Sequence, residues 1–202
     1  MRTMKTLLFL TNTLFVLTGL LHSQETDVNT ANWKPMVNIY GWSIKYPPDW
    51  DAHGKGHFTP ETTNGPIITG PIGGYKKGIR VGTIQIAVLP ITPNQSSKIS
   101  NLSLIQYVEK YCVNVDTADK KILSGPKKIQ VGGLTCYEIV YRRNKEYGGH
   151  KTSKVIYFKF KGKIGYIDYW EDFHDQKIIK SINDWELTST FEKIISTIKF
   201  RE

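Results

Sequence analysis

The sequence lacks the motifs that identify most reactions. No serine stands in a Gly-x-Ser-x-Gly turn, and the glycines from Gly70 to Gly78 follow neither a Gly-x-Gly-x-x-Gly nor a P-loop pattern. Only two cysteines are present, Cys112 and Cys136, and both fall at positions expected in the core, so neither suits a nucleophile activated by histidine. Catalysis by carboxylates distant in sequence is left open. Nothing in the sequence specifies an enzyme.

Long hydrophobic runs are also missing, except at the amino terminus. Arg2 and Lys5 form a short basic region, and the stretch from Leu7 to Leu21 is largely apolar but interrupted around Thr11. Such a run is shorter than the roughly 20 apolar residues that a membrane span needs. We therefore predict a cleaved signal peptide, residues 1–23, and a secreted or periplasmic mature chain without a transmembrane span. An uncleaved membrane anchor is the alternative.

Acidic residues are scarce relative to basic ones: 18 Asp and Glu stand against 27 Lys and Arg, a formal net charge of +9. Loss of Arg2 and Lys5 with the signal would leave about +7. The charge is spread along the chain, which is typical of a solvated basic surface, with attraction to an anionic lipid or envelope polymer as the second interpretation. Export, together with the absence of a nucleic-acid-binding motif, argues against nucleic acid as the partner.

The chain after the signal is 179 residues long, which suits one domain that buries roughly 70% of its unfolded surface. Residues 24–36 are polar and aperiodic, so we interpret them as a flexible leader, followed by a single domain over residues 37–202. No internal repeat and no low-complexity segment interrupts that domain.

Several strands are predicted by alternation. Tyr40, Trp42, Ile44 and Tyr46 form one apolar face that ends at two prolines, and residues 79–89 are apolar on both faces, as in a central strand. Two hairpins are expected as well. Gly132-Gly133 joins 127–131 to 134–143, with Val131 facing Leu134, and Lys161-Gly162 turns the hairpin 154–170, with Phe160 facing Lys163.

Two helices carry start signals. Ser103 and Gln106 match a capping box before a buried stripe that continues to about Val113. Ser189 and Glu192 match another, before apolar residues at helical spacing: Phe191, Ile194, Ile195 and Ile198. A further helix is expected over residues 178–185. These elements together predict an α+β fold, an antiparallel β-sheet sandwiched between helices.

Three passages resemble the PsbP-like and Mog1-like proteins: YGWSIKYPPDW at residues 40–50, GYI at 165–167, and FEKIISTIKF at 191–200. The resemblance extends over about residues 39–200. It implies the α/β/α architecture of that family and a non-enzymatic module that binds other proteins. Plant members sit on the oxygen-evolving photosystem and the Mog1 branch binds a nuclear GTPase, but neither role is carried over to a chain with a bacterial-type export signal.

One cluster of candidate metal ligands lies in the glycine-rich segment from Asp51 to Gly78. Asp51, His53 and His57 supply carboxylate and imidazole groups within seven residues, although their spacing matches no established ligand pattern. His174, beside Glu171 and Asp172, is a fourth candidate. The alternatives are polar residues of a solvated loop and, around His174, the acidic first turn of a helix.

The two cysteines permit one disulfide in an exported chain. Cys112 is expected on the buried stripe of a helix and Cys136 on the apolar face of a strand, so they are possible neighbours in the core. Two unpaired buried thiols are the alternative.

The sequence therefore favours an exported, non-enzymatic binding module with a protein partner in the cell envelope and no cofactor. The binding loop would be the segment 51–78 with its basic residues Lys76, Lys77 and Arg80. The alternatives are a metal-dependent envelope hydrolase that uses His53, His57 or His174 with a divalent metal, and electrostatic attachment to an anionic envelope lipid or polymer.

Overall fold

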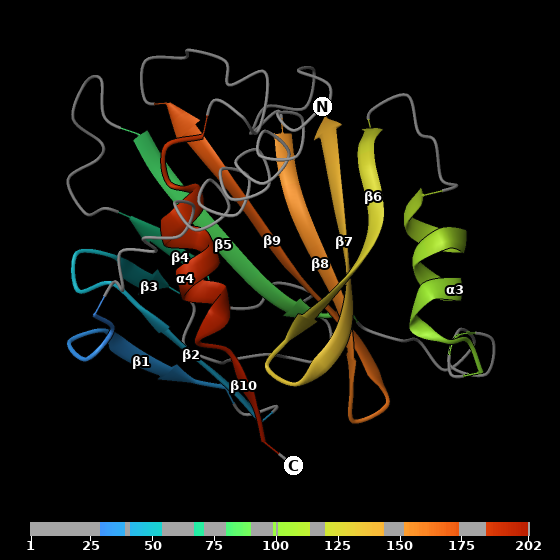
Figure 1. Ribbon diagram of the computed structural model, residues 1–202, viewed down its shortest axis with the longest axis horizontal. Coiled ribbons are helices and arrows are strands. Elements are labelled where there is room, and N and C mark those ends of the chain that lie inside the picture. Colours follow the sequence, from blue (N-terminus) through green and yellow to red (C-terminus); the bar gives the residue numbers. More distant parts are fainter. Residues whose placement is uncertain are drawn as a thin grey trace, which may run out of the picture. The chain divides into compact units, whose positions relative to one another are not determined.

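The computed structural model describes residues 29–38, 41–53, 67–70, 80–89, 99, 101–113, 120–143, 152–173 and 185–201. The chain divides into two units, residues 1–31 and 32–202, and the second contains all the described strands and helices. These strands form two sheets in which every pairing is antiparallel (Figure 1). The prediction of an antiparallel sheet is confirmed.

The smaller sheet has the order β1-β2-β10, formed by β1 (Lys34–Val37), β2 (Trp42–Tyr46) and β10 (Lys199–Phe200). The larger sheet has the order β3-β4-β5-β9-β8-β7-β6. Its strands are β3 (Asp51–His53), β4 (Ile67–Gly70), β5 (Arg80–Val88), β6 (Lys120–Val131), β7 (Leu134–Arg143), β8 (Thr152–Phe160) and β9 (Lys163–Phe173). The described helices are α3 (Leu104–Val108), continued by a π-helical turn at Glu109–Val113, and α4 (Thr188–Ser196).

Both predicted hairpins have the predicted register. Val131 pairs with Leu134 across the Gly132-Gly133 turn, and Phe160 pairs with Lys163 across Lys161-Gly162. Both glycines of the first turn have positive φ, +55° and +86°, as a two-residue hairpin turn requires. Because side chains alternate along a strand, this register decides which residues share a face of the sheet.

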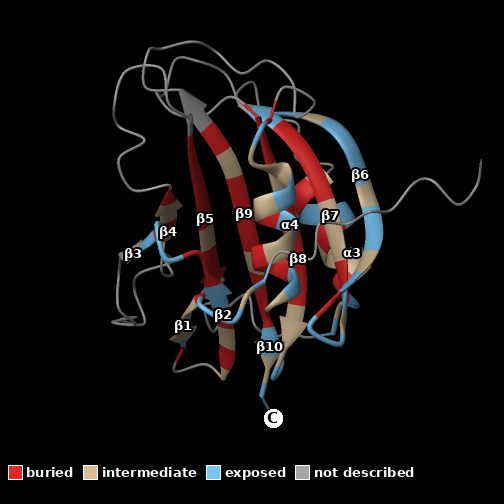
Figure 2. Cartoon of the chain, turned by 60° about the vertical axis from the view of Figure 1, so that its left-hand side comes forward, coloured by how far each residue is buried: buried red, intermediate tan, exposed pale blue. Residues whose placement is uncertain are grey.

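The larger sheet has a buried cluster on each face. On one face the strands pack against α4 and β2, and the cluster there includes Ile156, Ile167 and Phe191. On the other face they pack against α3, and that cluster includes Val108, Val155 and other residues of opposite strand parity. Buried residues line β5, β9, β8 and β7, whereas the edge strand β6 is mostly exposed or intermediate (Figure 2).

The predicted layers of helices describe this arrangement only partly. Among the described residues each face carries one short helix, and the α4 face is shared with the three-stranded sheet. β2 enters that cluster because the alternation of Trp42, Ile44 and Tyr46 gives it one continuous apolar face, as predicted.

The predicted leader is too long at its carboxyl end. Residues 34–36 belong to β1, which pairs with β2, and Trp33 before them is only 8% exposed within the core. Because polar residues surround Trp33, the segment shows no clear alternation of apolar and polar residues, and the strand was not predicted. The ordered domain therefore begins before residue 37, whereas the predicted signal peptide lies outside the described residues.

The two predicted capping boxes had different outcomes. At α3 the box is present, because Ser103 Oγ accepts from the Gln106 amide and Gln106 Oε1 accepts from the Ser103 amide. At α4 the prediction was wrong. That helix begins at Thr188, and Leu187 stands at the cap position without a side-chain cap bond.

The carboxylate of Glu171 satisfies the amides that precede α4. It accepts hydrogen bonds from the backbone N–H groups of Glu186 and Leu187, and it is almost fully buried. Glu171 and Asp172 belong to β9, so the predicted acidic first turn of a helix at this point was also wrong. Residues 178–184 of the helix predicted over 178–185 lie outside the described residues.

Across the segments that the structure describes, no helix combines the length and the apolar character that a membrane span needs.

Candidate binding site

The predicted metal ligands are not brought together within the described part of the chain. Asp51 is exposed on β3, a short strand paired with β4, and the backbone of His53 ends the same strand. His57 and His174 lie outside the described residues. Among the residues described, no group of three His, Cys, Asp or Glu is placed to hold a metal ion. The metal site, and the hydrolase that depends on it, stay predictions.

The predicted binding loop is described only in part. Its residues 51–53 and 67–70 form β3 and β4, which extend the larger sheet beyond β5. Lys76 and Lys77 lie outside the described residues, and Arg80 is the first residue of β5, where its backbone pairs with Phe173. Segment 51–78 therefore stays a prediction as a binding surface.

The two cysteines are free and buried. Cys112 lies in the cluster against α3 and Cys136 in the cluster against α4, on opposite faces of the sheet. The disulfide alternative is therefore wrong in this structure, and the alternative of two unpaired thiols holds. Burial raises the pKa of both thiols, that of Cys136 to about 11, which leaves them poor nucleophiles at neutral pH.

A cavity of about 340 Å³ lies between α4 and the strands β6, β7, β8 and β9. Its size falls at the lower end of the range for small-ligand sites. Isoleucines of β6, β8 and α4 form its apolar walls, and two carboxylates and a phenol are among its polar groups. It is lined by Ile129, Gln130, Val131, Gly132, Glu138, Ile156, Tyr169, Glu192, Ile195 and Ser196.

The helix presents one face to this cavity. Glu192, Ile195 and Ser196 stand at positions i, i+3 and i+4, which share one side of an α-helix. Aromatic contacts hold the helix in place: the ring of Phe191 lies 5.2 Å from that of Tyr169 on β9 and 5.7 Å from that of Trp185, which precedes the helix. Glu171 orients the backbone just before the helix. The cavity wall formed by α4 is therefore anchored at its start and along its length.

The Gly132-Gly133 turn approaches the segment that follows α4. A Cβ atom at Gly132 would lie 2.8 Å from the carbonyl oxygen of Ile198 and 2.9 Å from the ring of Phe200. Only glycine permits this approach at a φ of +55°. The turn that sets the hairpin register also lets the hairpin lie against the chain after the helix.

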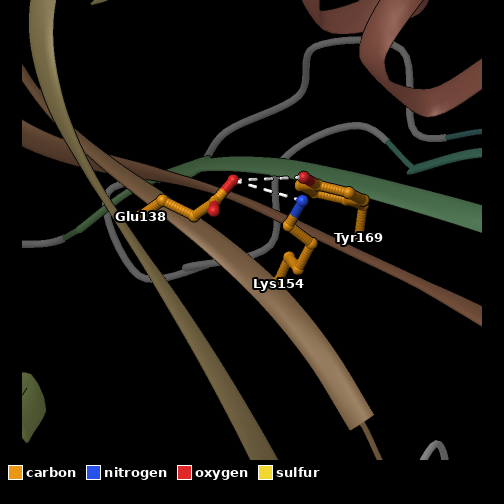
Figure 3. Close-up of polar contacts among 3 residues, drawn as sticks. All are labelled: Glu138, Lys154 and Tyr169. Atoms are coloured by element: carbon orange, nitrogen blue, oxygen red, sulfur yellow. Dashed lines mark hydrogen bonds and ion pairs between the residues drawn. The ribbon is translucent and has the colours of Figure 1, made fainter. Parts of the chain in front are cut away.

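Three polar side chains, Glu138, Lys154 and Tyr169, meet on the sheet (Figure 3), and Glu138 and Tyr169 also line the cavity. The carboxylate of Glu138 on β7 is 3.4 Å from the ammonium of Lys154 on β8. The hydroxyl of Tyr169 on β9 donates a long hydrogen bond, 3.5 Å, to the same oxygen of Glu138. The Lys154 ammonium also lies 5.5 Å from the centre of the Tyr169 ring. Neighbouring strands thus each contribute one member.

Burial raises the pKa of Tyr169, and the negative charges of Glu138 and Glu192 raise it further. The phenol therefore remains protonated at physiological pH and acts as a hydrogen-bond donor, not as a base. A neutral phenol, a paired ammonium and two carboxylates beside apolar walls are suited to recognition of a ligand.

The sequence predictions missed this group, although a signal for it exists. Glu138 interrupts the apolar face formed by Cys136 and Val140, and Lys154 precedes Ile156 on the face that enters the same cluster. A charged residue at a core-facing position of a strand is unusual unless it is paired. The pattern therefore flags both residues, but the strand order is needed to show that they are partners.

No family model and no curated protein matches the sequence. Several solved structures are similar to it, and two of them serve for comparison. Cyanobacterial PsbP (CyanoP) from Synechocystis sp. PCC 6803 has 13% identity and a TM-score of 0.45, over 86% of this chain and 95% of that one. LpqN of Mycobacterium tuberculosis, described as involved in cell envelope biogenesis, has 10% identity and a TM-score of 0.45, over 85% of this chain and 92% of that one. The first is a PsbP, the family that the sequence resembles.

Proposed function

We propose that this protein is an exported, non-enzymatic binding module that holds a protein partner in the cell envelope, and that the cavity beside α4 is its point of contact. The single observation that supports this is the cavity itself, with apolar walls and a few polar groups that converge on it. Such a composition is typical of binding sites. The raised pKa of Tyr169 fits recognition better than proton transfer.

Affinity capture tests the proposal. The exported form, residues 24–202, would be immobilised, exposed to envelope extract from its own source and washed with high salt. Ser196→Trp places a large side chain at the cavity, whereas Ser189→Trp makes the same change at an exposed position of α4 that does not line it. We expect one protein to be retained by the wild type and by the Ser189 variant and lost from the Ser196 variant. Equal retention by both variants would contradict the proposal.

A second candidate is electrostatic attachment to an anionic lipid surface. The edge strand β6 contains four lysines and no carboxylate, and Lys121, Lys127 and Lys128 are exposed on it. Basic residues near an anionic membrane contribute about 1 kcal/mol each, so three of them would contribute about 3 kcal/mol, or roughly 100-fold in affinity.

Vesicles of phosphatidylglycerol and phosphatidylcholine test this candidate by sedimentation at low and high salt. Replacement of the three β6 lysines by glutamine should release the protein, and high salt should do the same. The matched control makes the same change of charge at exposed lysines elsewhere: Lys45, Lys161 and Lys199. A control that loses as much binding would show that net charge matters and the strand does not.

A further inference from the structure

The charges that line the cavity are all of one sign. Glu138 and Glu192 line it, and none of the lining residues that the structure describes is a lysine or an arginine. Lys154 pairs with Glu138 but is not among the lining residues. A ligand in the cavity therefore meets carboxylates, although the protein as a whole carries a net charge of +9.

Both carboxylates retain capacity for a further cation. Glu138 receives Lys154 and Tyr169 on one oxygen, Oε2, and within the described segments its other oxygen, Oε1, has no hydrogen-bond partner. Glu192 is exposed on α4, and no cation among the described residues forms an ion pair with it. Each carboxylate oxygen accepts hydrogen bonds, and a cation is the strongest donor for it.

The apolar walls add a second requirement. Ile129, Ile156 and Ile195 line the cavity from two strands and the helix. Such walls favour an aliphatic stem, whose burial contributes about 0.8 kcal/mol for each CH₂ group. A metal ion or a small inorganic cation would leave these walls uncovered. Among the described lining residues, an anionic ligand would meet two carboxylates and no cation.

We propose that the cavity receives a basic side chain, a lysine or an arginine, from the partner protein. This rests on the proposed function and names the chemistry of its ligand. The aliphatic stem packs against the isoleucines, and the cationic head lies between Glu192 and Oε1 of Glu138. Because the net charge of the protein repels a free cation, the side chain alone binds weakly and the rest of the partner supplies further contacts.

Titration with side-chain analogues tests the inference. n-Butylguanidinium and n-butylammonium stand for the two side chains, and n-butanol is the neutral analogue of similar length. Amide chemical shifts of the ¹⁵N-labelled exported form report the site. We expect saturable shifts at millimolar analogue, concentrated in residues 129–132 and 192–196, and at least fivefold weaker binding of butanol.

Substitutions at two positions separate the effect of local charge from that of overall charge. Glu192→Gln should weaken binding of the cations two- to fivefold, as loss of an exposed ion pair does, and Glu192→Lys should weaken it more than tenfold. Glu109→Gln makes the same change of charge on an exposed residue of the other face and should have no effect. Both positions are exposed, so folding is retained in all three variants, which the amide spectrum verifies.

Equal binding of butanol, or equal effects of the Glu192 and Glu109 substitutions to glutamine, would overturn the inference. Micromolar binding of a free analogue would overturn the assignment to a partner's side chain and indicate a small organic cation as the ligand. These outcomes differ from failure of the proposed function. If the protein captures a partner through the cavity but binds none of the cationic analogues, the proposed function holds and the ligand is apolar instead of basic.

Discussion

The pair Glu138–Lys154 offers the sharpest test of how the site is held together. The two side chains are 17% and 13% exposed and 3.4 Å apart, so each charge is mostly withdrawn from water. Removing one partner of such a pair leaves the other buried and uncompensated, which typically costs 3–5 kcal/mol. Because Glu138 keeps the hydrogen bond from Tyr169 and borders the cavity, we expect Lys154→Met to lower the free energy of unfolding by about 2–3 kcal/mol.

Replacing both partners should cost less than replacing Glu138 alone, which leaves the Lys154 ammonium buried without its partner. The double variant Glu138→Leu/Lys154→Met leaves no charge to desolvate, but the buried hydroxyl of Tyr169 loses its acceptor, so we expect a loss of about 1–2 kcal/mol relative to the wild type. Urea unfolding measures the free energies, and an unchanged slope shows that the midpoints report stability. Lys121→Met, at an exposed position of β6, is the control and should change stability by less than about 0.5 kcal/mol.

The double-mutant cycle decides the outcome. If the effects of Glu138→Leu and Lys154→Met simply add, with a coupling below about 0.5 kcal/mol, the two groups do not interact and the reasoning is refuted. A coupling of about 2 kcal/mol or more would establish that the pair is the polar centre of this face of the sheet.

Three further predictions follow from buried polar groups. Glu171→Ala removes the acceptor of two backbone amides before α4 and should lower the free energy of unfolding by about 3 kcal/mol. Amide hydrogen exchange in α4 should become faster, and unchanged exchange would refute the role of Glu171. A thiol reagent at pH 8 without reductant should find no reactive thiol in the native protein and two in the denatured protein. Fewer than two reactive thiols in the denatured protein would support the disulfide between Cys112 and Cys136 instead. Burial raises the pKa of Tyr107 to about 12, and it also raises the pKa values of Tyr157 and Tyr169. The unfolded chain therefore loses these protons first, and the free energy of unfolding should fall as the pH rises above about 10. A urea midpoint that stays constant from pH 9 to 11 would contradict this.

Features that depend on a few neighbouring residues were predictable from the sequence. The register of both hairpins follows from two-residue turns, because Gly132-Gly133 and Lys161-Gly162 accept positive φ and fix which residues face each other. The start of α3 follows from Ser103 and Gln106, three residues apart. In each case the atoms that decide the structure are close along the chain.

Features that depend on distant segments were not predictable in the same way. β10 pairs with β2 across more than 150 residues. This pairing cannot be predicted from the sequence pattern of either strand. The start of α4 is capped from β9, since Glu171 reaches amides 15 and 16 residues further along the chain. The local signal at Ser189 was misleading because a stronger, buried carboxylate satisfies the preceding amides.

The candidate site shows the same division between local and tertiary information. By itself the sequence determined the alternation of side chains along the two predicted hairpins, which puts Glu138 on the same face as Cys136 and Lys154 on the same face as Ile156. Only the tertiary structure decided that α4 covers these residues, that the π-helical turn after α3 puts Cys112 on the face opposite Cys136, and that a cavity remains beside Tyr169. The physical reason is that packing across a sheet joins side chains whose separation in sequence carries no information about their contact.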